Sequence, residues 1–228
     1  YSSAASDVYK RQVYAKIMKN RFGAKKPESM RLRFHTQTAA ATLTKPQYMV
    51  NVMRTTTQEL AAELGGAQSL HTNGYDEAFA NPTENAMKLA LRTQQVIAAA
   101  TGVPQVVDPL GGSYFVESLT NDYEKKIFEI LDEVEELGGT IKLIEDGWFQ
   151  KHIADFAYET ALRKQSGDKP VIGVNRYVLD EKDVKIEIHP YDESTAKRQI
   201  ERTQSVRANR DEVKIQALLD KLVEEGLD

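Results

Sequence analysis

The residues with the clearest chemical potential lie between Arg31 and Gln37, where polar and apolar side chains alternate. The alternation predicts a strand over 31–37 with Arg31, Arg33, His35 and Gln37 on one face. The interior of a β/α barrel is normally filled by branched apolar residues, so this polar face indicates a lumen that holds water or a ligand. An edge strand with the same face in solvent explains the pattern equally well.

A second polar group follows, from Ser69 to Glu77. His71 and Glu77 could join His35 as metal ligands, but their spacing matches no known metal-binding motif, and we predict no metal site. Asn73 precedes a glycine, which is a common turn signal, and Glu77 is equally explained as a solvated loop acid. The chain has no serine-hydrolase set, phosphate-binding loop or dinucleotide-binding glycine pattern, so no catalytic residues are predicted from motifs.

The elements that position these residues alternate between helix and strand. We expect strands at 31–37 and 67–73, a helix from Pro46 to Gly65–Gly66, and another that Asn81 caps and that runs to Gly102. This order, with short loops, is typical of βα units on a parallel sheet. The apolar run 171–174 is a candidate third strand.

The second half of the chain is predicted to be helical. Helices are expected near 119–137, 141–145 and 149–164, and a pair of charged helices over 195–227 with a break near Asn209. Two strands and a doubtful third cannot close an eight-stranded barrel or form a typical open sheet. We therefore predict that the chain is a piece of a larger protein.

The composition is that of a globular protein. The 228 residues include 30 Lys+Arg, 34 Asp+Glu and no Cys, and 41% are hydrophobic. The lack of cysteine excludes disulfides, a thiolate nucleophile and cysteine-based metal sites. The slight acidity argues against a general nucleic-acid surface, and no apolar run is long enough to span a membrane, so we expect a cytoplasmic protein with no nucleic-acid or membrane partner.

Five segments occur in a fixed order that is highly specific as a set. They are Arg33-Phe34-His35-Thr36-Gln37-Thr38, Gln68-Ser69-Leu70-His71-Thr72-Asn73, Asp76-Glu77-Ala78, Asp108-Pro109-Leu110-Gly111-Gly112-Ser113-Tyr114 and Gly173-Val174-Asn175. Together they resemble the C-terminal part of the substrate-binding barrel of the methylmalonyl-CoA mutase large subunit family. The resemblance runs from about Val13 to the end of the chain. It is greatest to large chains whose cobalamin-binding domain can sit on a separate polypeptide, isobutyryl-CoA-type relatives included.

The resemblance implies an α/β fold: the C-terminal portion of a (β/α)8 TIM barrel, followed by a helical linker arm. In this family a CoA ester threads along the barrel axis and adenosylcobalamin lies across its C-terminal mouth. The implied reaction is a radical rearrangement of an acyl-CoA, most commonly (R)-methylmalonyl-CoA to succinyl-CoA, with isobutyryl-CoA or a related ester as the alternative. The cofactor carries this chemistry while the protein orients it and excludes water.

By the same resemblance, seven residues match family positions at the two ligands. Those on the cofactor side are Gln37, Ala40, Asn73, Glu77 and Ala80, and those on the substrate side are His35 and Gln68. Glu77 suits a ribose hydroxyl because a carboxylate accepts hydrogen bonds, and Ala80 matches a small residue beside the corrin. Ala40 departs from the family, which usually has glycine there, and Glu28 stands where a basic residue is frequent.

The resemblance also divides the chain into three parts. Residues 1–12 match nothing in the family and are expected to be foreign, 13–178 form the partial barrel, and 179–228 form a linker or partner-binding arm. The family's acyl-recognising residues lie upstream of this match and its cobalt ligand lies in another domain, so the piece is expected to be inactive alone. The implied partners are a cobalamin-binding domain or small subunit, in a dimer or heterotetramer. The alternative is a non-catalytic module that docks a cobalamin-binding partner.

Overall fold

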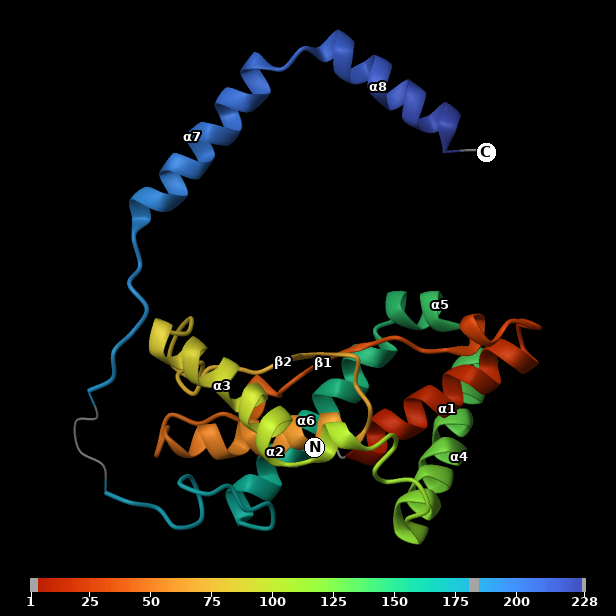
Figure 1. Ribbon diagram of the computed structural model, residues 1–228, viewed down its shortest axis with the longest axis vertical. Helices are drawn as coiled ribbons and strands as arrows, with labels where there is room; N and C mark the ends of the chain where they lie inside the picture. Colours follow the sequence, from red (N-terminus) through yellow and green to blue (C-terminus); the bar gives the residue numbers. More distant parts are fainter. Residues whose placement is uncertain (1–3, 181–184, 227–228) are drawn as a thin grey trace. The chain divides into compact units, whose positions relative to one another are not determined.

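The computed structural model describes residues 4–180 and 185–226, and within these ranges helices predominate (Figure 1). The α-helices are α1 (Ala4–Asn20), α2 (Val50–Leu64), α3 (Glu84–Ala100), α4 (Tyr114–Glu136), α5 (Thr140–Glu145), α6 (Trp148–Ser166), α7 (Glu193–Asn209) and α8 (Glu212–Glu225). The strands are β1 (His35–Gln37) and β2 (Ser69–His71), and short 3-10 turns are η1 (Pro27–Met30), η2 (Ala40–Thr42) and η3 (Val103–Gln105). The chain divides into two compact units, Tyr1–His189 and Pro190–Asp228, and the second unit contains α7 and α8.

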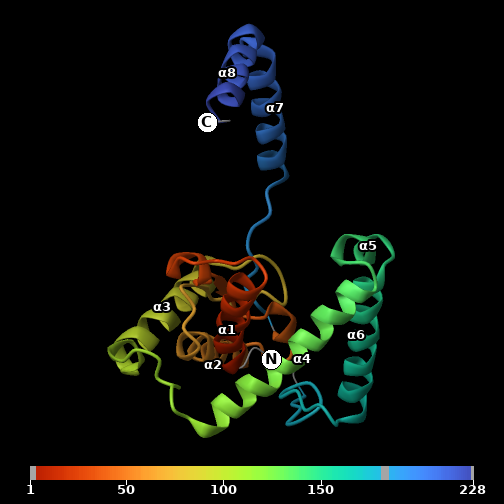
Figure 2. The ribbon, with the colours of Figure 1, turned by 90° about the vertical axis from the view of Figure 1, so that its right-hand side faces the viewer.

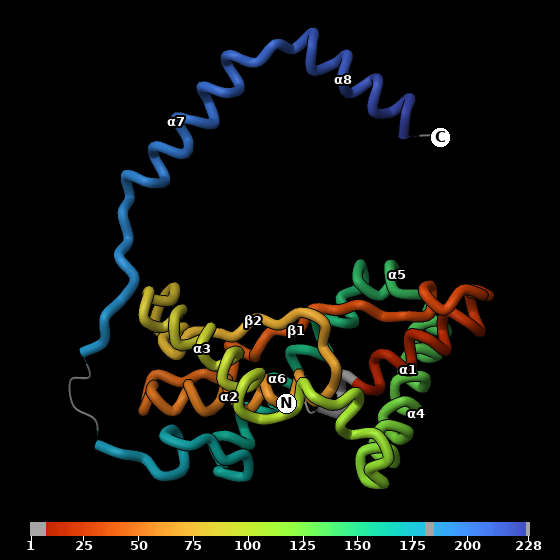
Figure 3. Tube along the Cα trace, viewed as in Figure 1, coloured from red at the N-terminus to blue at the C-terminus, as the bar shows by residue number. Residues whose placement is uncertain are grey.

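Strands β1 and β2 form a parallel pair, as the βα order predicts. His35 lies opposite Ser69, and Gln37 lies opposite His71. The tube trace shows the two strands side by side with α2 and α3 near them (Figure 3). Helix α2 lies between the two strands in sequence, and α3 follows β2, so the segment is a β-α-β-α succession.

Strand β1 is shorter than the predicted strand over 31–37. The reason lies in its hydrogen bonds, because the Phe34 N–H donates to the side chain of Gln68 at 2.9 Å and the Arg31 N–H closes η1 on Glu28 O. Neither amide pairs with a neighbouring strand. The predicted alternation still holds, since Arg31, Arg33, His35 and Gln37 are exposed while the residues between them are half-buried.

The predicted third strand at 171–174 is wrong. Val171 O accepts from the N–H groups of Val174, Asn175 and Arg176, and Gly173 has φ +81°, so the chain turns back on itself. The Asn175 side chain closes the turn by accepting from Val171 N at 2.6 Å and donating to Lys164 O and Lys169 O. Local side-chain bonding of this kind competes with strand pairing.

The helices occur in the predicted order, but some of them begin at other residues than predicted. Thr83, and not Asn81, caps α3 by accepting from Ala86 N, and α4 begins at Tyr114 because Ser113 caps it. Gly66 ends α2 with φ +79°, as predicted. The predicted pair of C-terminal helices is found as α7 and α8, although Leu227 lies outside the described residues.

Residues 4–12, which belong to the segment expected to be foreign, are part of the helical fold. Helix α1 continues through residue 12 and packs against α4 and α2 (Figure 2). Tyr9 stacks on Tyr123 with ring centroids 5.0 Å apart, and Gln12 and Lys16 both donate to Glu124. These donors lower the pKa of Glu124. The foreign origin of the segment stays a prediction.

Among the residues that the structure describes, the largest fully buried side chains are all polar: Glu59, Asn51 and Asn73. The buried polar residues are Thr38, Asn51, Thr55, Glu59, Thr72, Asn73, Asp76, Thr83, Thr93 and Thr120, against six buried apolar residues: Val13, Ala62, Ala86, Ile97, Val134 and Leu143. Buried polar groups need hydrogen-bond partners. The packing around the sheet is therefore specified by hydrogen bonds as much as by apolar contact.

Candidate functional site

The exposed face of the parallel pair carries His35 and Gln37 from β1 and Ser69 and His71 from β2. All four side chains are exposed, and paired residues of the register point to the same face. His35 Nδ1 lies 2.9 Å from Ser69 Oγ, which orients the imidazole against the neighbouring strand. This face offers hydrogen-bond donors and acceptors without a formal negative charge.

Gln68 serves the backbone at the start of β2. Its amide oxygen accepts from Phe34 N at 2.9 Å, and its amide nitrogen donates to Gly66 O at 2.6 Å. Gln68 therefore joins β1 to the end of α2, next to the face that His35 occupies. No motif or turn signal in the sequence predicts this role of Gln68, because the role depends on the tertiary contact between the two strands.

A hydrogen-bonded chain joins the two strand ends and the loop after β2. The Thr38 hydroxyl donates to Asn73 Oδ1, the Asn73 N–H donates back to Thr38 Oγ1 at 2.9 Å, and Asn73 Nδ2 donates to Glu77. Asn73 is 2% exposed and Glu77 is half-buried. The structure thus brings together Asn73 and Glu77, two of the predicted cofactor residues, and fixes the direction of the Glu77 carboxylate.

The loop after β2 is closed by the buried carboxylate of Asp76. Asp76 Oδ2 accepts from both the N–H and the hydroxyl of Thr83 at 2.9 Å, and Thr83 in turn caps α3. Gly74 is required here because a Cβ atom would lie 2.8 Å from Asp76 Oδ1 and 2.9 Å from Pro82 Cβ. This compact loop holds Glu77 and Ala80 beyond the carboxyl end of β2.

Ala40 lies in η2, directly after the end of β1. The Ala39 N–H donates to Gln58 Oε1 at 2.6 Å, and Gln58 Nε2 donates to Thr42 Oγ1 at 2.8 Å, so α2 holds the turn in place. The Ala40 side chain is exposed. Like Glu77 and Ala80, it follows the carboxyl end of a parallel strand, and these ends lie on the same edge of a sheet.

On the other side of β2, a buried carboxylate lies between helices. Glu59 of α2 is 1% exposed and accepts from Thr72 Oγ1 at 2.6 Å. Gln94 of α3 donates to the same hydroxyl at 3.1 Å and to Leu70 O at 3.3 Å. Burial raises the pKa of Glu59, the Thr72 hydrogen bond opposes this, and nearby Glu63 adds to the rise.

Thr38, Glu59 and Thr72 support the site through hydrogen bonds, and none of them was predicted from the sequence as a site residue. One signal could have found Glu59. The buried positions of α2 are Asn51, Thr55, Glu59 and Ala62, which share one helix face, so an acid stands where an apolar residue is expected.

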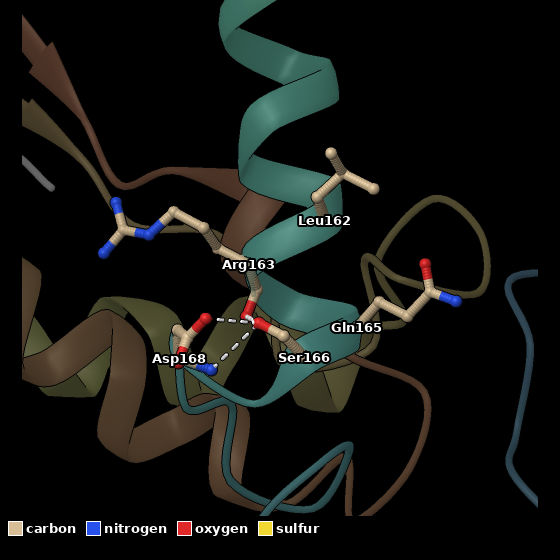
Figure 4. Close-up of a pocket in the computed structure, with 5 residues that line it drawn as sticks. All are labelled: Leu162, Arg163, Gln165, Ser166 and Asp168. Carbon is tan, nitrogen blue, oxygen red and sulfur yellow. Dashed lines mark hydrogen bonds between the residues drawn. The ribbon is translucent and has the colours of Figure 1, made fainter.

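A surface hollow at the end of α6 lies among residues that no prediction involves (Figure 4). Its lining residues are Leu162, Arg163, Gln165, Ser166 and Asp168. Ser166 Oγ donates to Asp168 Oδ2 at 2.6 Å, and Gly167 ends the helix with φ +86°. These contacts form a helix-terminating turn.

Two further searches cover the residues that the structure describes. Within 4–180 and 185–226, no group of three or more His, Asp or Glu side chains could hold a metal ion. No helix in the same ranges is long and apolar enough to cross a membrane.

Comparison with known proteins identifies the family. The methylmalonyl-CoA mutase family profile matches residues 9–226. The chain is 78% identical over 213 residues to the 2-hydroxyisobutanoyl-CoA mutase large subunit of Aquincola tertiaricarbonis, covering 93% of this chain and 38% of that protein. It is 43% identical to the methylmalonyl-CoA mutase large subunit of Porphyromonas gingivalis (92% of this chain, 29% of that protein) and 36% identical to the human mitochondrial methylmalonyl-CoA mutase (94% and 28%).

The chain thus spans less than two fifths of the length of these relatives. The profile also begins at residue 9, so the expectation that residues 1–12 match nothing in the family is corrected for residues 9–12. The family match and the partial coverage of these relatives agree with the five motifs that carry the resemblance. The chain belongs to the methylmalonyl-CoA mutase family.

Proposed function

We propose that this chain is the C-terminal part of the substrate-binding (β/α)8 barrel, with its linker arm, of an adenosylcobalamin-dependent acyl-CoA mutase. The observation that carries the proposal is the chain of hydrogen bonds from Thr38 through Asn73 to Glu77, at the carboxyl ends of two parallel strands. Ligands of βα folds bind at these ends. The family match supports the same assignment.

The residues at the strand ends fit the adenosyl side of such a cofactor. Glu77 accepts one hydrogen bond from Asn73, and a carboxylate has acceptor capacity left for the two hydroxyls of a ribose. Ala40 and Ala80 are small, so they leave room for a flat macrocycle. When bound, adenosylcobalamin supplies the carbon radical that starts the rearrangement.

The residues of the exposed sheet face fit an acyl-CoA chain. His35, Gln37, Ser69 and His71 present donors and acceptors that match the amide and thioester groups of pantetheine. In the proposed barrel this face lines the lumen, where side chains hold the ester and keep water away from the reacting carbon. We propose that β1 and β2 are two of its strands.

The identity to the 2-hydroxyisobutanoyl-CoA mutase large subunit favours a 2-hydroxyisobutanoyl-type ester over methylmalonyl-CoA, because it is 78% against 43% for the Porphyromonas gingivalis methylmalonyl-CoA mutase large subunit. The name "large subunit" of both relatives supports a smaller, cobalamin-binding partner, which we propose for this protein also. The charged helices α7 and α8 belong to the linker arm in this proposal. A cytoplasmic location is consistent with a chain that contains no cysteine.

The experiment is an ester panel. The full-length large chain that carries this segment is assembled with its cobalamin-binding partner and assayed on 2-hydroxyisobutanoyl-, isobutyryl- and methylmalonyl-CoA. We expect the highest kcat/KM on 2-hydroxyisobutanoyl-CoA. A preference for methylmalonyl-CoA would overturn the substrate assignment, and no adenosylcobalamin-dependent turnover of any ester would overturn the enzyme class.

A further inference from the structure

Thr72 and Asn73 are neighbours whose side chains serve opposite sides of β2. Asn73 reaches Thr38 and Glu77 at the strand end, whereas Thr72 reaches Glu59 of α2 and Gln94 of α3. Consecutive residues of an extended chain alternate in this way. A shift of Thr72 toward or away from the helices therefore moves Asn73 by a comparable amount.

The Thr72 hydroxyl makes two hydrogen bonds, one as a donor and one as an acceptor. It donates to Glu59 Oε2 at 2.6 Å and accepts from Gln94 Nε2 at 3.1 Å, and the same amide nitrogen lies 3.3 Å from Leu70 O. One donor and one acceptor on two helices thus hold a single atom of the strand. Thr72 itself is 5% exposed, so water does not replace these partners.

Glu59 is a costly residue for a structural role alone. It is 1% exposed, and in the described part of the chain no lysine, arginine or histidine forms an ion pair with it. A buried carboxylate without a cation lowers stability, and an apolar residue of the same size is often tolerated better. A buried carboxylate held by a hydroxyl can instead specify one geometry of the groups around it.

We propose that Glu59, acting through Thr72, is a positioning residue. It fixes the position of the Asn73 side chain, and hence that of the Glu77 carboxylate on the cofactor side of the site. The inference rests on the proposed function, because it assigns Glu77 to adenosylcobalamin. Glu59 touches neither ligand in this scheme. It holds Thr72, directly after β2, from the side of the helices, while the Asp76–Thr83 pair closes the loop that follows.

The test uses the full-length large chain assembled with its cobalamin-binding partner. Thr72→Val removes the hydroxyl, and Glu59→Leu removes the acceptor. For both we expect adenosylcobalamin Kd to rise about tenfold and kcat to fall, with the KM for the acyl-CoA ester within about twofold of the unchanged protein, which corresponds to the loss of one buried hydrogen bond. Thr72→Ser and Glu59→Gln keep the donor and the acceptor, and should restore most of the cofactor affinity.

Thr120→Val is the matched control. Thr120 is also buried and lies on α4, but its hydroxyl has no hydrogen-bond partner among the residues that the structure describes. This variant should keep the cofactor Kd and kcat of the unchanged protein. It separates the loss of a particular hydrogen bond from the general effect of replacing a buried threonine by valine.

The outcomes are distinguishable. If the unchanged complex neither binds adenosylcobalamin nor turns over an ester, the proposed function fails whatever Glu59 does. If it is active and Thr72→Val and Glu59→Leu lower thermal stability while Kd and kcat stay unchanged, Glu59 is merely structural and the inference is overturned. If both of these variants fail to fold, Gln94→Leu carries the test, because it removes the other hydrogen bond to Thr72 Oγ1. A raised adenosylcobalamin Kd with an unchanged KM for the ester supports the positioning role, and an unchanged Kd overturns it.

Discussion

Among single residues, the buried Glu59 makes the free energy of unfolding depend on pH. Burial raises the pKa of Glu59 in the folded chain, so the folded state binds a proton more tightly than the unfolded state does. The contribution of Glu59 to the free energy of unfolding therefore falls as the pH rises from 4.5, the ordinary value, through the raised folded pKa, and is constant above it.

Glu59→Gln should remove this pH dependence. The free energy of unfolding of the variant minus that of the unchanged chain should increase as the pH rises through this window. Urea unfolding of the assembled full-length protein, carrying either Glu59 or Glu59→Gln, at a series of pH values between about 4 and 8 measures the difference. Glu145→Gln, at an exposed acid of α5, serves as the control. A difference that stays constant with pH, or that decreases, contradicts the assignment.

Ala40 gives a second prediction, because the family resemblance implies that its methyl group stands at a position where glycine is usual. If the methyl is a steric burden on the corrin, Ala40→Gly should bind adenosylcobalamin about twofold tighter or more, less the cost of a more flexible η2 turn. Ala41→Gly, at the adjacent exposed residue of the same turn, adds the flexibility without removing the contact. Cofactor titration of both variants in the assembled enzyme decides, and weaker binding by Ala40→Gly than by Ala41→Gly would refute the contact.

At the scale of elements, the loop that follows β2 depends on a close approach at Gly74. A Cβ atom there would lie 2.8 Å from Asp76 Oδ1, 2.9 Å from Pro82 Cβ and 3.2 Å from Ala86 Cβ, so the loop has no room for a methyl group. Gly74→Ala should lower stability by about 1–3 kcal/mol and weaken adenosylcobalamin binding. Gly111→Ala, whose nearest contact is at 3.2 Å, is the control. Equal stability of the two variants would contradict this account of the loop.

The elements also show what the sequence could predict and why the rest escaped it. The period-two pattern over 31–37 predicted which side chains are exposed, because exposure on a strand follows from alternation alone. It could not predict the length of β1, since that depends on which amides find a partner strand. The turn at 171–174 escaped because Asn175, which closes it, lies just outside the apolar run.

The candidate site divides in the same way. His35, Gln37, Asn73 and Glu77 were found through polar residues at strand ends and through family motifs. Thr72 and Glu59 were not, because a threonine in a strand and a glutamate in a helix are ordinary in local sequence. Only the tertiary contact between α2 and β2 makes them unusual.

At the scale of the whole molecule, large apolar side chains lie in solvent on helices with few neighbours. Tyr114 is 93% exposed, Phe115 75%, and Ile153 and Phe156 of α6 69% and 68%. The two-stranded sheet adds open edges, which pair readily with other chains. The 228-residue chain alone should therefore associate at micromolar concentration and bind a hydrophobic dye. A cooperatively unfolding monomer whose size is independent of concentration would contradict this expectation.

In the proposed enzyme, Glu77, held by Asn73 and Thr38, faces the adenosyl group of the cofactor. The most direct measurement is separate titration of adenosylcobalamin and of the acyl-CoA ester against the assembled enzyme carrying Glu77→Ala, with Glu145→Ala as the control acid. Loss of a hydrogen bond to a charged partner costs about 1.5–3 kcal/mol, so we predict that Glu77→Ala raises the adenosylcobalamin Kd about tenfold or more and leaves the ester Kd unchanged. An adenosylcobalamin Kd and turnover equal to those of Glu145→Ala would show that Glu77 is an ordinary loop acid and would contradict the account.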